Sequence, residues 1–299
     1  MLQNYHSKIL RVVGTLVVLT TLCYTDKITN SFRKVKIAVV DTGADVNNIR
    51  ISDNLILPDG TKADKDCWGV DARFVENGKS SDRTNPFSCQ ADDLSGHGSH
   101  VISTILGINP FAEIISIKYE EGSSLIYYNS YRKALYIAAT SDADIINLSL
   151  TGYNYNKEER DILEFASSLG KIIVVAAGNK NTNQKMYPAG YSDEISGLFA
   201  VMSTDRQGKK LKSSNYGSHV NARALGVISA YDNNGNIKTK RGTSMAAAAV
   251  SGMISLMIVE DNFTYMPDVG YFVNKAKGRQ DIVSRNLGFN VGRSPSSLK

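Results

Sequence analysis

Five short apolar runs recur along the chain, and longer stretches with helical spacing separate them. The runs are rich in β-branched residues and carry few charges. Such a run is typical of a strand buried on both faces, and its alternation with helices favours a parallel sheet. We therefore predict an α/β fold, a mostly parallel sheet with helices on both faces, in a single domain over residues 36–299. The predicted strands are 36–40, 113–119, 144–150, 171–176 and 198–204, and the predicted helices are 98–106, 125–140, 158–169 and 244–259.

Residues 51–95 break this alternation. They are rich in Asp, Asn, Gly and Lys and contain Pro58 and Pro86. Clusters of these residue types mark turns and loops. We predict that the segment is an irregular surface insertion between the first strand and the helix that follows it.

The amino-terminal residues have the pattern of an export signal. Lys8 and Arg11 precede an uncharged stretch over residues 12–23, which is short for a membrane-spanning helix. We predict a signal peptide over residues 1–23 and a short linker over 24–35, so that the protein is exported to the medium or the periplasm. Two alternatives remain: an uncleaved leader that anchors the chain to a membrane, or a buried first element of an intracellular protein.

The cysteine count bears on the same question. The chain has three cysteines, and removal of a leader that ends at Cys23 leaves Cys67 and Cys89. A disulfide between them would suit an oxidising compartment. The alternative is a pair of small unpaired residues.

The net charge of +5 is concentrated at the two ends of the chain. Residues 1–36 and 271–299 are basic, whereas the central part is mildly acidic. A nucleic-acid groove requires Lys and Arg gathered on one face. We therefore expect no nucleic-acid partner, and contact with a membrane only through an uncleaved leader.

Chemically reactive residues follow several of the predicted strands. Asp41 follows the first strand, residues 147–151 lie at the end of the third, and Gly178 and Asn179 follow the fourth. Ligands of open parallel sheets gather at the carboxyl ends of the strands, so these residues should face one crevice. His97 and Ser244 lie in small-residue segments where two helices begin. Together they supply a nucleophile, a base, a carboxylate and an oxyanion donor.

Three segments resemble the signature segments of the subtilisin-like serine proteases, the subtilase family. They are residues 40–43 (VDTG), 96–101 (GHGSHV) and 242–246 (GTSMA), in the family's order of Asp, His and Ser. Residues 146–150, 176–179 and 187–189 resemble further family segments, so the likeness runs from about residue 36 to about 252. The resemblance implies a subtilisin-like fold and a serine endopeptidase that acts on extended polypeptides.

The resemblance also implies a role for each residue. Ser244 would be the nucleophile, His97 the general base and Asp41 the carboxylate that orients it. Asn179 would donate its side-chain amide to the oxyanion. The substrate-binding residues would be Ser149, Leu150, Thr151 and Gly178.

Each residue also has a simpler interpretation. Asp41 could cap the turn that follows it, and Ser244 could belong to tight small-residue packing. His97 and His100 could bind a metal ion with nearby acidic residues, although their spacing is not that of a zinc helix. A further alternative is a catalytically silent protein of this fold that binds peptides or a partner.

The resemblance implies no cofactor for catalysis but allows a structural calcium ion. Calcium needs six to eight converging oxygen ligands, and acidic content alone does not identify them. The ligands therefore stay unassigned. The acidic residues of the insertion are Asp53, Asp59, Asp64, Asp66, Asp71, Asp82, Asp92 and Asp93.

The interval between the predicted leader and the predicted peptidase domain is shorter than the family resemblance implies. Secreted relatives carry a prodomain that assists folding, and residues 24–35 are too few for one. The chain would then fold unaided, use a helper or inhibitor in trans, or resemble the intracellular branch of the family.

Overall fold

The computed structural model describes residues 34–73, 88–119 and 125–260. Its main sheet has the strand order β2-β4-β1-β5-β6-β7-β8, with β3 paired to β4, and every pairing in it is parallel. The strands are β1 (Lys36–Asp41), β2 (Leu55–Ile56), β3 (Val70–Asp71), β4 (Glu113–Lys118), β5 (Ile145–Leu148), β6 (Ile172–Ala176), β7 (Leu198–Thr204) and β8 (Ala222–Leu225). A separate antiparallel hairpin joins β9 (Val227–Tyr231) to β10 (Ile237–Arg241).

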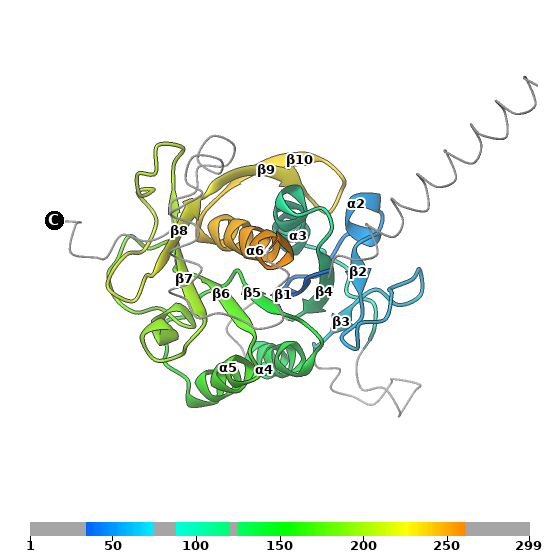
Figure 1. Cartoon of the computed structure of the whole chain (residues 1–299), viewed down its shortest axis with the longest axis horizontal. Helices are drawn as coiled ribbons and strands as arrows, with labels where there is room; N and C mark the ends of the chain where they lie inside the picture. The colour runs from blue at the N-terminus through cyan, green and yellow to red at the C-terminus, as the bar shows by residue number, and fades with distance from the viewer. Residues whose placement is uncertain (1–33, 74–87, 120–124, 261–299) are drawn as a thin grey trace, which may run out of the picture.

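Helices cover both faces of this sheet, as Figure 1 shows. On one face lie α3 (His97–Ile108) and α6 (Thr243–Glu260), with the short α2 (Ile49–Ser52) beside them. On the other face lie α4 (Leu125–Thr140) and α5 (Lys157–Ser168). A 3-10 helix, η1 (Ala189–Asp193), precedes β7.

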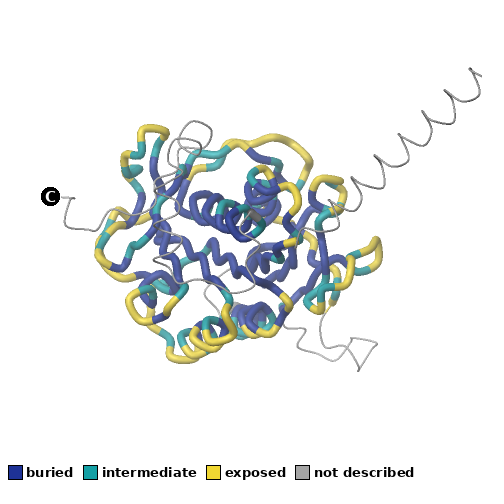
Figure 2. Tube along the Cα trace, viewed as in Figure 1, coloured by how far each residue is buried: buried dark blue, intermediate teal, exposed yellow. Residues whose placement is uncertain are grey.

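The period of two along each strand divides the core between these faces. In β1, Ile37 and Val39 pack with α3 and α6, whereas Ala38 and Val40 pack with α4 and α5. All four side chains are buried. Figure 2 shows the buried sheet at the centre and exposed residues along the outer loops and the outer sides of α4 and α5. This two-sided burial explains why the strands are continuous apolar runs.

The predicted α/β fold is confirmed, and each predicted strand and helix overlaps an observed one. The insertion 51–95 is less irregular than predicted, because β2 and β3 within it pair with β4. The sequence analysis also missed β8 and the β9–β10 hairpin. Most side chains of β10 are exposed, so no apolar run marks that strand.

The predicted leader lies outside the described residues. Within the three described ranges, no helix combines the length and the apolar character needed to cross a bilayer.

Candidate functional site

The carboxylate and the base form a direct contact. Asp41 is the last residue of β1, and its Oδ1 lies 2.7 Å from Nδ1 of His97 at the start of α3. The same Oδ1 accepts a hydrogen bond from the backbone N–H of Thr42 at 2.8 Å. Asp41 is buried, whereas His97 is partly exposed. The carboxylate therefore orients a ring whose other edge is accessible to substrate.

A second carboxylate, missed by the sequence analysis as a site residue, holds this pair in place. Asp93 is buried, and its Oδ1 accepts hydrogen bonds from Thr42 Oγ1 at 2.8 Å and from Gly96 N–H at 2.8 Å. Its Oδ2 accepts from Ser99 N–H at 2.8 Å. Asp93 thus connects the turn after Asp41 to the first turn of the helix that carries His97. No local pattern marks Asp93 as a site residue, because Gly96 is the N-cap residue of α3 and Thr42 lies 51 residues from Asp93 in the chain.

The candidate nucleophile lies at the beginning of α6. Ser244 is the second residue of α6, where the helix dipole favours negative charge. Its Oγ donates to the backbone carbonyl of Ser149 at 3.0 Å, and Ser149 Oγ donates to the carbonyl of Ser244 at 2.9 Å. These two hydrogen bonds fix the end of β5 against the start of α6.

Asn179 contacts Thr243, the residue before Ser244, with its amide in a defined orientation. Its Oδ1 accepts hydrogen bonds from the backbone N–H of Thr243 at 3.0 Å and from Thr243 Oγ1 at 3.3 Å. Because both contacts engage the oxygen, Nδ2 is the edge of the amide that is left as a donor. Asn179 is also exposed, so that donor is accessible to a ligand.

The loop that carries Asn179 depends on a second asparagine, which the sequence analysis did not single out. Asn215 is fully buried, and its Nδ2 donates to the carbonyl of Ala177 at 2.8 Å. Its Oδ1 accepts from Lys180 N–H at 2.8 Å. Gly178 has a φ of +102°, and a Cβ there would lie 2.4 Å from Asn215 Nδ2. No local pattern could have shown this contact, because Asn215 lies 38 residues from Ala177 in the chain.

The predicted substrate residues lie at the same edge of the sheet. Ser149, Leu150 and Thr151 directly follow β5, and Ser149 contacts Ser244. The next residue, Gly152, forms two backbone hydrogen bonds with Tyr187, at 2.6 and 2.9 Å. This bridge joins the 149–152 segment to the loop that follows Asn179.

The alternative of a metal site at the histidines finds no support in the geometry. His100 is buried, and its Nε2 donates to the carbonyl of Lys238 at 2.9 Å. Asp93 is engaged by backbone N–H groups, as described above. In the part of the chain that the structure describes, no group of three or more His, Cys, Asp or Glu side chains could hold a metal ion.

Two acidic residues of the insertion each hold their own turn. Asp59 accepts hydrogen bonds from Thr61 N–H and Oγ1, and Asp64 accepts from the N–H groups of Asp66 and Cys67. Asp82 lies outside the described residues. The ligands of a structural calcium ion therefore stay unassigned.

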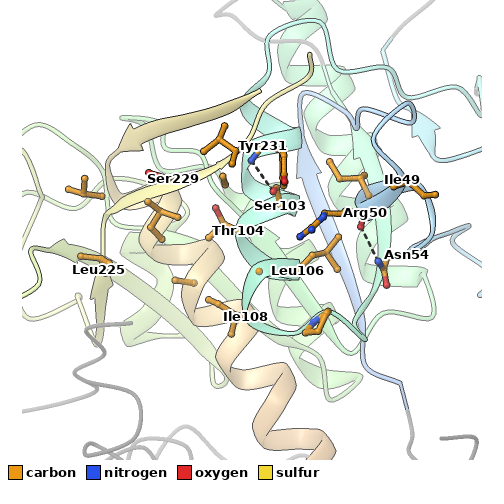
Figure 3. Close-up of a pocket in the computed structure, with 18 of the residues that line it drawn as sticks. Ile49, Arg50, Asn54, Ser103, Thr104, Leu106, Ile108, Leu225, Ser229 and Tyr231 are labelled. Atoms are coloured by element: carbon orange, nitrogen blue, oxygen red, sulfur yellow. Dashed lines mark hydrogen bonds between the residues drawn. The ribbon is translucent and has the colours of Figure 1, made fainter. Parts of the chain in front are cut away.

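A pocket of about 850 Å³ lies between α2, α3 and the β8–β9 region (Figure 3). Arg50, Ser103, Leu225 and Tyr231 are among its lining residues, and Tyr231 N–H donates to Ser103 Oγ at 3.0 Å. None of the predicted site residues lines it. The pocket is therefore separate from the residues that surround Ser244.

The fold and this arrangement define a class of protein. A parallel α/β sheet with an Asp–His pair, a serine at a helix start and an asparagine amide at its carboxyl edge has the arrangement expected of a serine hydrolase.

Comparisons with known proteins agree with this class. The sequence pattern of the subtilase family matches residues 33–289. Thermitase from Thermoactinomyces vulgaris is 31% identical over 224 residues, which are 74% of this chain and 74% of thermitase. Subtilisin amylosacchariticus from Bacillus subtilis subsp. amylosacchariticus is 27% identical over 234 residues. That alignment covers 75% of this chain but only 55% of the subtilisin.

Solved structures show the same fold. A cold-adapted subtilisin-like serine proteinase aligns with a TM-score of 0.62 at 25% identity, over 76% of each chain. The epidermin leader peptide processing serine protease of Staphylococcus aureus aligns with a TM-score of 0.65 at 20% identity, over 78% of this chain and 66% of that one. The chain belongs to the subtilase family, and its enzyme class is that of a serine peptidase, a hydrolase. Subtilases need no cofactor for catalysis.

We predict that Asp93 positions the catalytic pair without touching substrate. Asp93→Asn replaces one of the two acceptor oxygens by an NH2 group, which cannot accept the hydrogen bond that this oxygen receives. A misplacement of about 1 Å at a reacting group costs roughly 10²-fold in rate, so kcat should fall by about 10- to 100-fold with little change in KM. Steady-state kinetics on a peptide substrate measure this.

Asp92→Asn is the matched control, because Asp92 is the exposed neighbour of Asp93. The control should keep the parental kcat. An unchanged kcat in a folded Asp93→Asn protein would contradict the positioning role.

The two buried histidines predict how stability depends on pH. Burial lowers the pKa of His100 and of His219, so the folded state favours their neutral forms. As the pH falls below about 6.5, the unfolded chain binds protons that the folded chain does not, and the free energy of unfolding decreases. Burial raises the pKa of Glu159, so at acidic pH the folded chain binds a proton there more readily than the unfolded chain does. This contribution increases the free energy of unfolding as the pH falls, opposite to that of the histidines.

Comparison with a variant that lacks His219 isolates the contribution of that histidine. In a Ser244→Ala background, which prevents self-digestion, His219→Gln should lessen the loss of stability between pH 7.5 and 5.5 by about 1 kcal/mol. Urea unfolding at the two pH values measures it. Equal losses with and without His219 would contradict the prediction.

Proposed function

We propose that this protein is a serine endopeptidase that hydrolyses extended polypeptides through an acyl-enzyme intermediate. The observation that carries the proposal is the 2.7 Å contact between Asp41 Oδ1 and His97 Nδ1. With Nδ1–H donating to Asp41, Nε2 is the ring atom that accepts a proton. A protein that only binds peptides has no need of an oriented base.

The first half of the reaction forms the acyl-enzyme. Ser244 Oγ attacks the carbonyl carbon of the scissile bond while its proton passes to His97 Nε2. Asp41 stabilises the resulting imidazolium. The tetrahedral intermediate then collapses, and His97 gives the proton to the departing amine. In the second half, a water molecule attacks the acyl carbon in the same way and releases Ser244.

Two donors stabilise the oxyanion in this proposal. One is Nδ2 of Asn179, whose orientation follows from the contacts of Oδ1 with Thr243. The other is the backbone N–H of Ser244 at the start of α6, where the helix dipole adds to the effect. Removal of one such donor costs roughly 10²- to 10³-fold in kcat.

The substrate lies along the segment after β5. A peptide in extended conformation adds as a strand beside Ser149, Leu150 and Thr151, so main-chain hydrogen bonds supply much of its affinity. The Gly152–Tyr187 bridge supports this segment from the other side. Gly178, which leaves no room for a side chain beside Asn215, lines the space for the residue before the cut.

Export through the leader is part of the same proposal. The support is the sequence pattern alone: two basic residues followed by the uncharged stretch 12–23. An endopeptidase that acts on extended polypeptides would then meet its substrates outside the cytoplasm.

Labelling with a fluorophosphonate probe tests the nucleophile. The probe reacts with a serine hydroxyl only where a base activates it. We expect one label per chain on Ser244, located by peptide mass spectrometry, and none on the Ser244→Ala variant.

The control for the base is His97→Ala, which leaves Ser244 in place. Its labelling rate should fall by at least 10²-fold because the hydroxyl loses its proton acceptor. If folded parental protein stays unlabelled, or if it labels as fast without His97, the proposed mechanism is wrong.

Amino-terminal sequencing tests export. In a bacterial host, protein recovered from the periplasm or the medium should begin at Tyr24, directly after the predicted signal peptide. Replacing Lys8 and Arg11 by Glu should retain the chain inside the cell. Full-length protein found only in the cytoplasm would contradict the export proposal.

A further inference from the structure

The backbone brings Cys67 and Cys89 close together in the folded chain, and both are partly buried thiols. The N–H groups of Trp68 and Gly69, the two residues after Cys67, both donate to the carbonyl of Cys89, at 2.9 and 3.1 Å. Cys89 Sγ lies 3.7 Å from the carbonyl oxygen of Asp66, the residue before Cys67. Two cysteines held this close can form a disulfide without a large movement of the backbone.

The segment that begins at Cys89 leads directly to the catalytic pair. Two residues later, the carbonyl of Ala91 accepts a hydrogen bond from Ala44 N–H at 2.8 Å, in the turn after Asp41. Four residues after Cys89 comes Asp93, which connects that turn to α3. A constraint on Cys89 therefore acts on the backbone that supports both Asp41 and His97.

We propose that Cys67 and Cys89 form a redox site, whose disulfide fastens the segment 88–93 to the segment 64–69 and so stabilises the support of the catalytic pair. The cross-link closes a loop of 22 peptide units between positions 67 and 89. It restricts the unfolded chain far more than the folded one, where the two residues are already adjacent.

A low-molecular-weight disulfide such as oxidised glutathione is a sufficient oxidant. The Cys89 thiolate attacks it, forms a mixed disulfide and releases one glutathione thiolate. Cys67 then loses its proton and attacks Cys89 Sγ, which releases the second glutathione. The two protein thiols lose two electrons and two protons, and one glutathione disulfide becomes two thiols.

Burial and the neighbouring Cys89 raise the pKa of Cys67, so its thiolate is a small fraction of the Cys67 population at neutral pH. The same two steps balance if the roles of the two cysteines are exchanged.

Thiol counting and thermal unfolding test the proposal. The sample is the full chain with Ser244→Ala, which prevents self-digestion, and Cys23→Ser, which removes the third cysteine. Equilibration with oxidised glutathione should lower the number of alkylatable thiols from two to none and give a linked Cys67–Cys89 peptide. The melting temperature should rise by roughly 5–10 °C, and dithiothreitol should reverse the change.

The single variants Cys67→Ser and Cys89→Ser serve as controls in the same background. Neither should show a redox-dependent melting temperature. Two thiols that stay alkylatable in the oxidised sample, or glutathione that stays attached to Cys89, would overturn the redox site. A linked peptide without a rise in melting temperature would overturn the stabilising role. These measurements need no peptidase activity, so they are independent of the proposed function.

Discussion

No side chain separates the turn after β1 from the first turn of α3, and the catalytic geometry depends on this close packing. A Cβ on Gly98 would lie 2.3 Å from the carbonyl oxygen of Gly43, and a Cβ on Gly43 would lie 2.3 Å from that of Ala91. The backbone at Gly43 therefore lies in van der Waals contact with that at Ala91 on one side and with that at Gly98 on the other. Asp93 adds charge-assisted hydrogen bonds to the same junction, and such bonds are about twice as strong as neutral ones. The Asp41–His97 contact is a consequence of this arrangement.

Ser244, the proposed nucleophile, is fixed by a separate set of contacts at the start of α6. Ser251 Oγ of α6 donates to Asn147 Oδ1 of β5 at 2.9 Å, and Asn147 Nδ2 donates to Ser149 Oγ at 3.0 Å. Ser149 in turn bonds to Ser244 in both directions. The chain of hydrogen bonds runs from the sheet to the start of α6 and is buried along most of its length. Close packing of α3 on α6, where Gly252 meets Ile105 and Ile108, brings the two sets together.

The sequence predicted the parts of the fold that rest on burial. Strands such as β5 and β6 are buried on both faces, so their apolar runs were sufficient evidence. The hairpin strand β10 was missed because most of its side chains are exposed. Among the candidate site residues, Asp41, His97 and Asn179 were predicted from their segments and their resemblance to a family, and their catalytic roles stay predictions. Asp93 and Asn215 were not, because their role lies in contacts with Thr42 and Ala177, which are 51 and 38 residues away. Only the folded chain brings these residues together.

The same architecture holds the proposed catalytic residues and the proposed substrate segment by different contacts. Asp41, His97 and Ser244 are held by the packing of α3 and α6 against one face of the sheet. The segment that follows Thr151 is held from the opposite side, because Tyr191 OH bonds to Glu159 of α5 and to the backbone of Asn156. Tyr155 and Tyr187 pack edge to face beside Tyr191. The tyrosine cluster and the Asp41–His97 pair therefore depend on different contacts, so a change in the cluster leaves the contacts of the pair in place. Burial raises the pKa of Glu159, because it disfavours the charged carboxylate. The hydroxyl groups of Tyr131 and Tyr191 donate hydrogen bonds to this carboxylate, at 2.6 and 2.9 Å, and so offset part of the rise in pKa.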